Sequence, residues 1–217
     1  MKTKYNRSMH LPFSPGTTSD DRIAKSVDPL LNVPVIISEK LDGENCGMTR
    51  EGVYARSHAT FTTSPWSVMV RTLHSVLKND IEEGTFVFGE NMEGIHSIEY
   101  ENLTSPFYIF GIRKGSTWLS WKEVEEFSFL TEVPTVPVLF KGIFATEREL
   151  TDKVMQLVAQ ESALGGKREG IVIRLAESFD DADFSTSLMK WVRKGHVTTS
   201  EHWTKTWRKA RIKNWSY

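Results

Sequence analysis

Short apolar segments separated by turn-forming residues recur along this chain, and they constrain its fold more than any other feature. In the clearest case, residues 47–49 and 53–56 flank the turn Arg50-Glu51-Gly52. A turn this short joins antiparallel strands, because parallel strands need a crossover connection of about a dozen residues or more. A second hairpin is predicted at residues 107–120, and further strands at residues 35–41, 85–91, 135–141, 169–175 and 187–192.

Helix signals lie between these strands. Three helices are predicted, and they begin at Ser64-Pro65, at a capping box of Ser120 with Glu123, and at a capping box of Thr146 with Glu149. We expect them to end near residues 77, 130 and 163. Hairpins interspersed with helices predict an α+β fold with mainly antiparallel sheets and flanking helices.

The chain of 217 residues is long enough for one large domain. Residues 1–34 contain four prolines and one glycine, and we expect an irregular leader with one turn of helix near residues 20–26. The sequence thus predicts a single domain, 1–217, made of a leader (1–34), a core (35–194) and a C-terminal extension (195–217).

The C-terminal extension is basic. From Lys190 to the end there are eight Lys or Arg and one acid, Glu201, on a chain whose net charge is −1. Residues from 200 onward are predicted to be helical, with Trp203 and Trp207 among the cations. This mixture suits phosphate contacts and base stacking. The alternative is a helix that packs its tryptophans on the core and leaves its cations in solvent.

Other compositional features narrow the class of protein. The single cysteine, Cys46, excludes an internal disulfide and fits a reducing compartment. The chain has no CxxC or HExxH pattern, no long apolar run and no signal peptide. We therefore expect a cytoplasmic protein without a membrane partner or a zinc site.

The stretch Glu39-Lys40-Leu41-Asp42-Gly43 follows the apolar run at residues 35–37. A lysine amine attacks phosphorus only when it is neutral, and its ordinary pKa is about 10.4. Burial, neighbouring cations or a metal-bound phosphate must therefore favour the neutral form. Asp42 could balance charge or hold a metal, and Gly43 lets backbone approach a ligand. The alternative is an ordinary surface lysine at a strand end.

Five further short patterns follow this stretch in order. They are Ala55-Arg56-Ser57, Phe88-Gly89-Glu90-Asn91, Phe107-Tyr108-Ile109-Phe110-Gly111, Glu169-Gly170-Ile171-Val172-Ile173-Arg174 and Met189-Lys190-Trp191. The whole series resembles the covalent nucleotidyltransferase superfamily of ligases and capping enzymes, and most closely the ATP-dependent RNA ligases of the RNA ligase 2 branch. The resemblance covers about residues 35–194 and implies a nucleotidyltransferase adenylation domain of the ATP-grasp-like ligase type.

The resemblance implies catalytic roles for Lys40, Glu169 and Lys190. Lys40 would attack the α-phosphate of ATP, expel pyrophosphate and carry AMP, while Lys190 would neutralise the α-phosphate. Mg²⁺ (or Mn²⁺) would be positioned by Glu169, with Asp42 and Glu90 as possible helpers. The residues implied in ATP binding are Glu39, Lys40, Asn45, Arg56, Glu90, Phe110, Glu169, Lys190 and Lys194.

The individual ATP contacts follow from the same resemblance. Phe110 would stack on adenine, although it could instead belong to the sheet core. Glu39 would lie beside the adenine, and Arg56 would hold the ribose or an incoming 5′-phosphate. Asn45 is implied in the sealing steps. Relatives often carry a second lysine where Val192 stands here, so Arg193 or Lys194 would have to replace it.

The implied activity is ATP-dependent sealing of an RNA 5′-phosphate to a 3′-OH, with RNA repair as its purpose. Only 23 residues follow Lys194, too few for the oligonucleotide-binding barrel of DNA ligases and capping enzymes, so we expect no such domain. A monomer is favoured. Two alternatives stay open: a minimal ATP-dependent DNA ligase, and a nucleotide- or RNA-binding module without catalysis.

Overall fold

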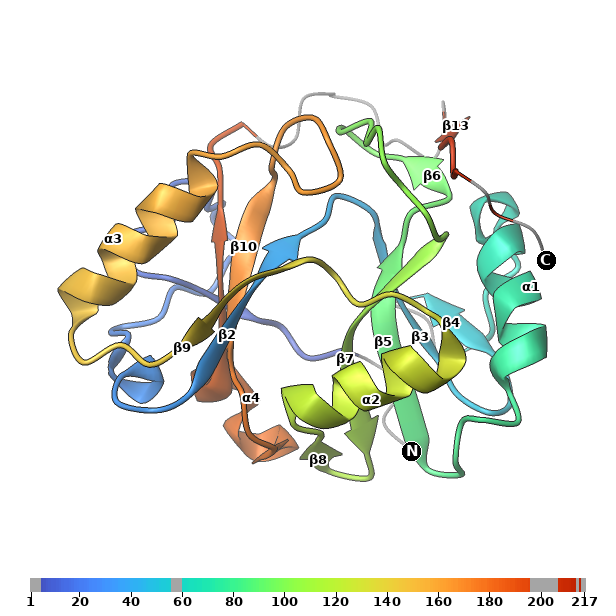
Figure 1. Ribbon diagram of the computed structural model, residues 1–217, viewed down its shortest axis with the longest axis horizontal. Helices are drawn as coiled ribbons and strands as arrows, with labels where there is room; N and C mark the ends of the chain where they lie inside the picture. The colour runs from blue at the N-terminus through green and yellow to red at the C-terminus, as the bar shows by residue number, and fades with distance from the viewer. Residues whose placement is uncertain (1–4, 56–59, 196–206, 214, 216–217) are drawn as a thin grey trace.

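Two β-sheets lie side by side in the computed structural model, which describes residues 5–55, 60–195, 207–213 and 215 (Figure 1). Sheet 1 has five strands in the order β1 (Met9–His10), β12 (Leu188–Val192), β10 (Gly170–Leu175), β2 (Val35–Lys40) and β9 (Val138–Gly142). Sheet 2 has six strands in the order β11 (Phe179–Asp180), β8 (Thr117–Trp118), β7 (Phe107–Lys114), β5 (Thr85–Asn91), β3 (Glu44–Met48) and β4 (Val53–Ala55).

Neighbouring strands in both sheets are antiparallel, except for β1, which pairs in parallel with β12. The helices lie outside the sheets: α1 (Val68–Leu77) beside sheet 2 and α3 (Glu147–Val158) beside sheet 1, with α2 (Trp121–Thr131) and the short α4 (Phe184–Ser187) at one end (Figure 1). The described residues also form three 3₁₀ turns, η1 (Asp28–Leu30), η2 (Pro65–Ser67) and η3 (Asp181–Asp183). The α+β prediction is therefore confirmed.

The alternation of β2 divides its side chains between two environments. Val35 and Ile37 are fully buried in the apolar cluster that includes Leu150 and Val154 of α3. Ile36 belongs to the other large cluster, which α1 and sheet 2 share. Because successive side chains of a strand point to opposite faces, Lys40 lies on the face of Ile36, which is turned toward sheet 2.

Local signals give most of the predicted elements. Ser120 accepts a hydrogen bond from the Glu123 N–H, and the Glu123 carboxylate accepts one in return, so the α2 capping box is present. The predicted hairpin at residues 47–56 forms β3 and β4. The predicted strand at 135–141 is formed as β9, which begins after Pro137 and lies at the edge of sheet 1, a position where proline is tolerated.

Helix boundaries differ from the prediction in two places. The helix after Thr146 ends at Val158 and not near residue 163, because residues 159–169 turn back to meet β2 through Glu39. Ser64 makes no side-chain cap, and the helix begins with the turn η2 before the α-helical part at Val68.

The two ends of the chain also correct the sequence predictions. Residues 20–26 contain no helical turn; the first helical turn is η1 at Asp28–Leu30. The supposed leader supplies β1 and the fully buried side chains of Leu11 and Val27. Residues 207–213 are not helical. They contain the strand β13 (Arg208–Lys209), which pairs with β6 (Gly94–Ile95).

Trp203 lies outside the described residues, so its predicted stacking role stays a prediction. Trp207 packs edge-on against Trp66, with 6.0 Å between ring centroids. Within the described ranges, no helix combines the length and the apolar character needed to cross a membrane.

Candidate active site

A cavity of about 620 Å³ lies between the two sheets. Sheet 1 contributes Lys40, Val172 and Lys190 to its wall, and sheet 2 contributes Glu90 and Phe110. In register, Lys40 is opposite Gly170, and Val172 is opposite Lys190. Since residues 170 and 172 share a face of β10, the two lysines project from the same face of sheet 1. The fold therefore assembles residues that are far apart in sequence around one space.

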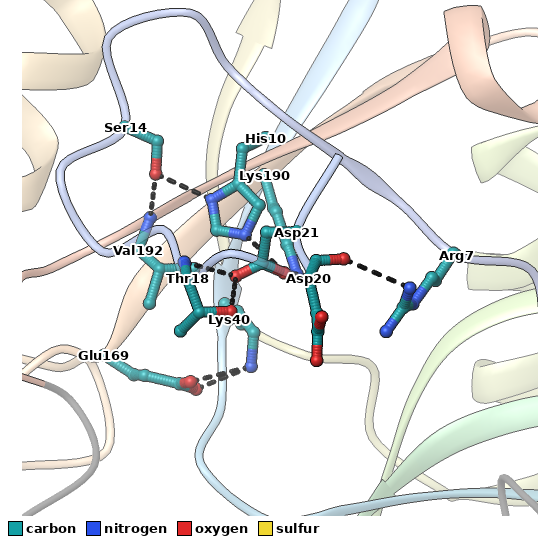
Figure 2. A network of polar contacts seen from close by, with 10 residues as sticks. All are labelled: Arg7, His10, Ser14, Thr18, Asp20, Asp21, Lys40, Glu169, Lys190 and Val192. Atoms are coloured by element: carbon teal, nitrogen blue, oxygen red, sulfur yellow. Dashed lines mark hydrogen bonds and ion pairs between the residues drawn. The ribbon is translucent and has the colours of Figure 1, made fainter. Parts of the chain in front are cut away.

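Lys40, which lines the cavity, is paired with Glu169 (Figure 2). Lys40 Nζ donates to both carboxylate oxygens of Glu169, each 2.8 Å away. The Lys40 side chain is 27% exposed and that of Glu169 only 5%. Glu169 directly precedes β10, where a Cβ on Gly170 would lie 2.1 Å from the Trp191 carbonyl oxygen. A glycine at 170 thus lets β12 and β10 approach closely beside the pair.

The charges around Lys40 favour its protonated form. Burial lowers the pKa of Lys40, but the carboxylates of Glu169 and Glu90 outweigh this effect and leave the pKa above its usual value. Burial also raises the pKa of Glu90 to about 8, although the Lys40 ammonium opposes the change. Attack on phosphorus needs a neutral amine, whereas these carboxylates keep Lys40 protonated. The bound nucleotide and its cation therefore have to bring about the loss of the Lys40 proton.

Glu90, Asn45 and Phe110 reach the cavity from sheet 2. Glu90 lies near the end of β5, is 9% exposed, and accepts a hydrogen bond from the Gly43 N–H at 3.2 Å. Asn45 is opposite Glu90 in register, and its Oδ1 is buried without a hydrogen-bond partner among the described residues. The half-buried Phe110 ring meets the Tyr5 ring edge-on at 5.2 Å between centroids.

Two acids of the lysine stretch hold loops. Asp42 Oδ2 accepts hydrogen bonds from the N–H groups of Ser97 and Ile98, each at 2.8 Å. Glu39 Oε2 accepts from the Ala163 N–H at 2.9 Å and lies 3.6 Å from Arg168 Nη2. These loop contacts were not foreseen, since no local pattern signals them. Glu39 also lines the cavity, and its buried Oε1 has no hydrogen-bond partner among the described residues.

The structure does not bring the predicted second cation, Lys194, into the cavity. Lys194 lies just past β12, is exposed, and is not among the lining residues. Arg56 lies outside the described residues. The strand before it, β4, belongs to sheet 2, whereas Lys40 lies in β2 of sheet 1.

Several lining residues were missed from the sequence. They are Tyr5, Ser8, Trp66, His96 and Arg174, among others. Arg174 is 2% exposed, and its guanidinium donates to the carbonyl oxygens of Leu119 and Leu175 at 2.6 and 3.1 Å. Trp66 falls at the start of the helix predicted after Ser64-Pro65, and Tyr5 belongs to a segment without any periodic pattern. No signal in the sequence places either of them at the cavity.

The acids near Lys40 suit a divalent cation bound largely through water. In the described part of the chain, no cluster of three or more His, Cys, Asp or Glu is placed to hold an ion directly. Glu169 and Glu90 both act on the charge of Lys40, and carboxylate oxygens are the ligands that Mg²⁺ and Mn²⁺ prefer. Because Mg²⁺ keeps several of its waters, two carboxylates suffice for such a site. Asp42 fits it less well, since Oδ2 is already bonded to two N–H groups.

Comparison with known proteins identifies relatives of this arrangement. The family model described as RNA ligase matches residues 33–192. No curated protein sequence matches the chain.

Among solved structures, a mutant of the Naegleria gruberi RNA ligase with ATP and Mn superposes with a TM-score of 0.57 and 18% identity, over 77% of this chain and 52% of that one. The same ligase with PPi gives 0.57 and 20%, over 77% and 51%. A putative ATP-dependent DNA ligase from Aquifex aeolicus gives 0.55 and 19%, over 79% and 46%. The chain spans about half the length of these structures, and the likeness establishes the shared fold.

Proposed function

Because this chain belongs to the RNA ligase family, we propose that it is an ATP-dependent RNA ligase that works through a covalent lysyl-AMP. The observation that carries the proposal is the environment of Lys40. The amine lies in a cavity large enough for a nucleotide, 2.8 Å from Glu169, with Lys190 on the same face of the sheet. A surface lysine at a strand end, the alternative from the sequence, would have none of these neighbours.

The reaction consists of three displacements at phosphorus. In the first, Lys40 Nζ attacks the α-phosphorus of ATP, the bond to the bridging oxygen breaks, and pyrophosphate leaves while the amine loses a proton. In the second, an oxygen of an RNA 5′-phosphate attacks the same phosphorus and the N–P bond breaks. In the third, an RNA 3′-OH attacks the activated 5′-phosphorus and AMP leaves. Each leaving group is stable, so positioning and charge neutralisation supply most of the acceleration.

The cavity residues divide these tasks by chemistry. Phe110 offers a half-buried aromatic ring in the wall of the cavity, which suits stacking on adenine. The Glu39 Oε1 and Asn45 Oδ1 atoms are buried acceptors that have no hydrogen-bond partner among the described residues, so donors on a nucleotide can satisfy them. Lys190 adds a positive charge for the α-phosphate. Arg56 and Lys194 stay candidates for the ribose or the 5′-phosphate.

A divalent cation held through Glu169 and Glu90 would supply positive charge beside the amine and the α-phosphate. Glu169 itself has a second task, because its carboxylate is the present partner of the Lys40 ammonium. For the amine to attack, that ion pair has to open and the proton has to leave. Glu90, with a pKa raised to about 8, is an acid that can exchange a proton near neutral pH.

The nearest rival is an ATP-dependent DNA ligase, since a putative enzyme of that kind shares the fold. The two functions differ in the strand that they seal. A nick with a ribose on its 3′-OH side should be joined by an RNA ligase, whereas a DNA ligase should also join the all-deoxyribose nick. RNA repair in the cytoplasm stays a prediction.

The deciding experiment is covalent labelling. The protein is incubated with α-³²P-ATP and a divalent cation and then run on a denaturing gel. We expect label to stay on wild type and to be absent from Lys40→Ala and Lys40→Arg, while Lys78→Ala, a change of an exposed lysine on the last turn of α1, keeps it. Wild type without label would refute the enzyme and leave the binding-module alternative. GTP and NAD as donors test the choice of nucleotide.

A further inference from the structure

The N-terminal residues hold the backbone on both sides of Lys190. Strand β1 pairs in parallel with β12, with His10 opposite Lys190. The Leu11 N–H donates to the Lys190 carbonyl oxygen at 2.8 Å, and the Gly16 N–H donates to that of Val192 at 2.9 Å. A Cβ on Gly16 would lie 2.4 Å from the Arg193 carbonyl oxygen, so only glycine allows this approach. The segment thus fixes the strand that carries the lysine.

Side chains of the same segment form a polar chain that leaves β12 and returns to it (Figure 2). The Val192 N–H donates to Ser14 Oγ at 3.0 Å, and Ser14 Oγ lies 2.9 Å from His10 Nδ1. His10 Nε2 lies 3.2 Å from Asp21 Oδ1, and this oxygen lies 3.6 Å from Lys190 Nζ. The chain therefore begins at one residue of β12 and ends on the ammonium group two residues earlier.

The imidazole of His10 is held between Ser14 and Asp21. Ser14 Oγ accepts from the Val192 N–H and shares a hydrogen bond with His10 Nδ1. On the other side of the ring, Nε2 lies 3.2 Å from Asp21 Oδ1, which is an electrostatic contact between the imidazole and the carboxylate. His10 is only 1% exposed, so the ring is held in this position by the packed residues around it.

Asp21 is held as a carboxylate in a fixed position. Its Oδ2 accepts from the backbone N–H and from the hydroxyl of Thr18, each at 3.0 Å. Burial raises the pKa of Asp21, but Thr18, Lys190 and His10 outweigh this and bring it to about 2. With Oδ2 bound to Thr18 and Oδ1 facing His10, the carboxylate cannot rotate without breaking a hydrogen bond. An anion of fixed orientation is thus presented to Lys190, whose side chain is 18% exposed.

We propose that Asp21, supported by His10, is a positioning residue that holds the Lys190 ammonium group ready for the α-phosphate of ATP. The inference rests on the proposed function, in which Lys190 neutralises charge at that phosphate. A flexible lysine loses side-chain entropy of up to about 2 kcal/mol when it is ordered. A cation fixed before the reaction needs no such reorganisation, which is how preorganised charges accelerate phosphoryl transfer.

The test compares Asp21→Asn with Asp20→Asn. Asp20 is the neighbouring exposed acid, and removing its charge leaves the contacts of Lys190 intact. The rate of AMP transfer to Lys40 at saturating ATP is measured in a single turnover, with folding checked by circular dichroism. We expect Asp21→Asn to slow the step by about tenfold, which is less than the roughly 100-fold that a 1 Å misplacement can cost, because Lys190 itself is still present. Asp20→Asn should stay within about a factor of two of wild type.

A double-mutant cycle separates positioning from simple loss of structure. In a Lys190→Ala background, Asp21→Asn should cause no further slowing, because the group through which it acts is gone. An equal loss in both backgrounds would overturn the proposal, and so would equal rates for the two single Asn variants. His10→Gln, which keeps a polar group beside Asp21, should be faster than His10→Ala.

A second measurement does not depend on activity. Trace acetylation with acetic anhydride, read by peptide mass spectrometry, reports the neutral fraction of each amine. Without the Asp21 anion beside it, Lys190 should react about threefold faster or more, since an opposite charge favours the protonated form. Lys122, which is 86% exposed, is the internal reference. Equal Lys190 labelling in Asp21→Asn and wild type would refute the pairing. If wild type takes up no AMP but Lys190 still reacts faster in Asp21→Asn than in wild type, only the proposed function is refuted.

Discussion

Lys40 Nζ lies 2.8 Å from both carboxylate oxygens of Glu169, although 129 residues separate the two along the chain. The short distance puts the proposed nucleophile and the proposed metal-positioning acid into one ion pair. Because attack on phosphorus needs a neutral amine, the same carboxylate that orients Lys40 also holds its proton. Removing this carboxylate should therefore have opposite effects on the reactivity of the amine and on catalysis.

Glu169→Gln tests this opposition. Without the negative charge, the neutral fraction of Lys40 should rise, and trace acetylation of Lys40 should become about threefold faster or more. Transfer of AMP from ATP should nevertheless slow by roughly 100-fold, because charge stabilisation at the phosphate is lost. Glu82→Gln is the matched control, since it removes the partner of Lys114 from an exposed ion pair, where the effect on acetylation should be small. Parallel changes of acetylation and AMP transfer would contradict the dual role.

Glu90 should make stability fall as pH rises. Its pKa is about 8 in the folded protein and 4.5 as an unperturbed group, so between these values the folded state binds more protons than the unfolded state. By linkage the free energy of unfolding then decreases from about pH 4.5 to about pH 8 and levels off above. Glu90→Gln removes this term, so the variant should gain Tm relative to wild type at pH 8 and gain less at pH 5.

Thermal unfolding followed by circular dichroism at the two pH values measures this difference. Glu99→Gln, a change of an acid whose side chain is 61% exposed, is the control and should shift Tm equally at both. If the Glu90→Gln difference were the same at pH 5 and pH 8, the carboxyl would not titrate between them.

Gly43→Ala should disturb the connection between the two sheets. A Cβ at this position would lie 2.5 Å from the Asn91 carbonyl oxygen and 2.7 Å from Met92 Sδ. The Asn91 carbonyl belongs to the backbone of β5 and cannot move aside easily. We therefore expect a loss of about 1–3 kcal/mol in the free energy of unfolding. Slower AMP transfer should accompany it. Gly115→Asn is the control, because nothing lies within 4 Å there and asparagine tolerates its φ of +60°. Urea unfolding compares the two variants.

Phe110→Ala should weaken the use of ATP without abolishing it. Loss of stacking on a base costs roughly 1–3 kcal/mol, which corresponds to an increase of about 5- to 150-fold in the KM for ATP. Phe110→Tyr keeps a ring face and should stay close to wild type. Phe129→Ala, at a position that is 84% exposed on α2, controls for the removal of a phenyl ring. An unchanged KM for ATP in Phe110→Ala would mean that Phe110 does not stack on the base and belongs to the sheet core instead.

The elements that could be predicted are those with local signals. The α2 capping box lies within four consecutive residues, and the turn between β3 and β4 is set by Gly52 and its neighbours. The order of the short patterns predicted which residues would meet Lys40. Glu90 and Lys190 line the same cavity as Lys40, and Glu169 is the ion-pair partner of Lys40, while their roles in the reaction stay predictions.

The parts that could not be predicted depend on contacts between distant segments. Strands β1 and β13 have two residues each, which is too short for any periodic pattern, and they exist because a neighbouring strand offers free hydrogen-bonding groups. Asp42 was assigned by its place beside the nucleophile, but its geometry is decided by the N–H groups of Ser97 and Ile98. Asp21 has no signal in its own neighbourhood, because its partner Lys190 lies near the other end of the chain.

Residues 41–43 are the whole of the direct link between β2 in sheet 1 and β3 in sheet 2. Lys40, the proposed nucleophile, therefore belongs to sheet 1, and Phe110, proposed to stack on the base, belongs to sheet 2. Each sheet has its own hydrogen-bond ladder, and only three residues join β2 to β3. A nucleotide bound between them would contact both sheets and so stabilise their relative position. Substitutions that disturb packing far from the cavity could then lower activity as an active-site mutation does. They would change the angle between the sheets without altering any residue that contacts the nucleotide.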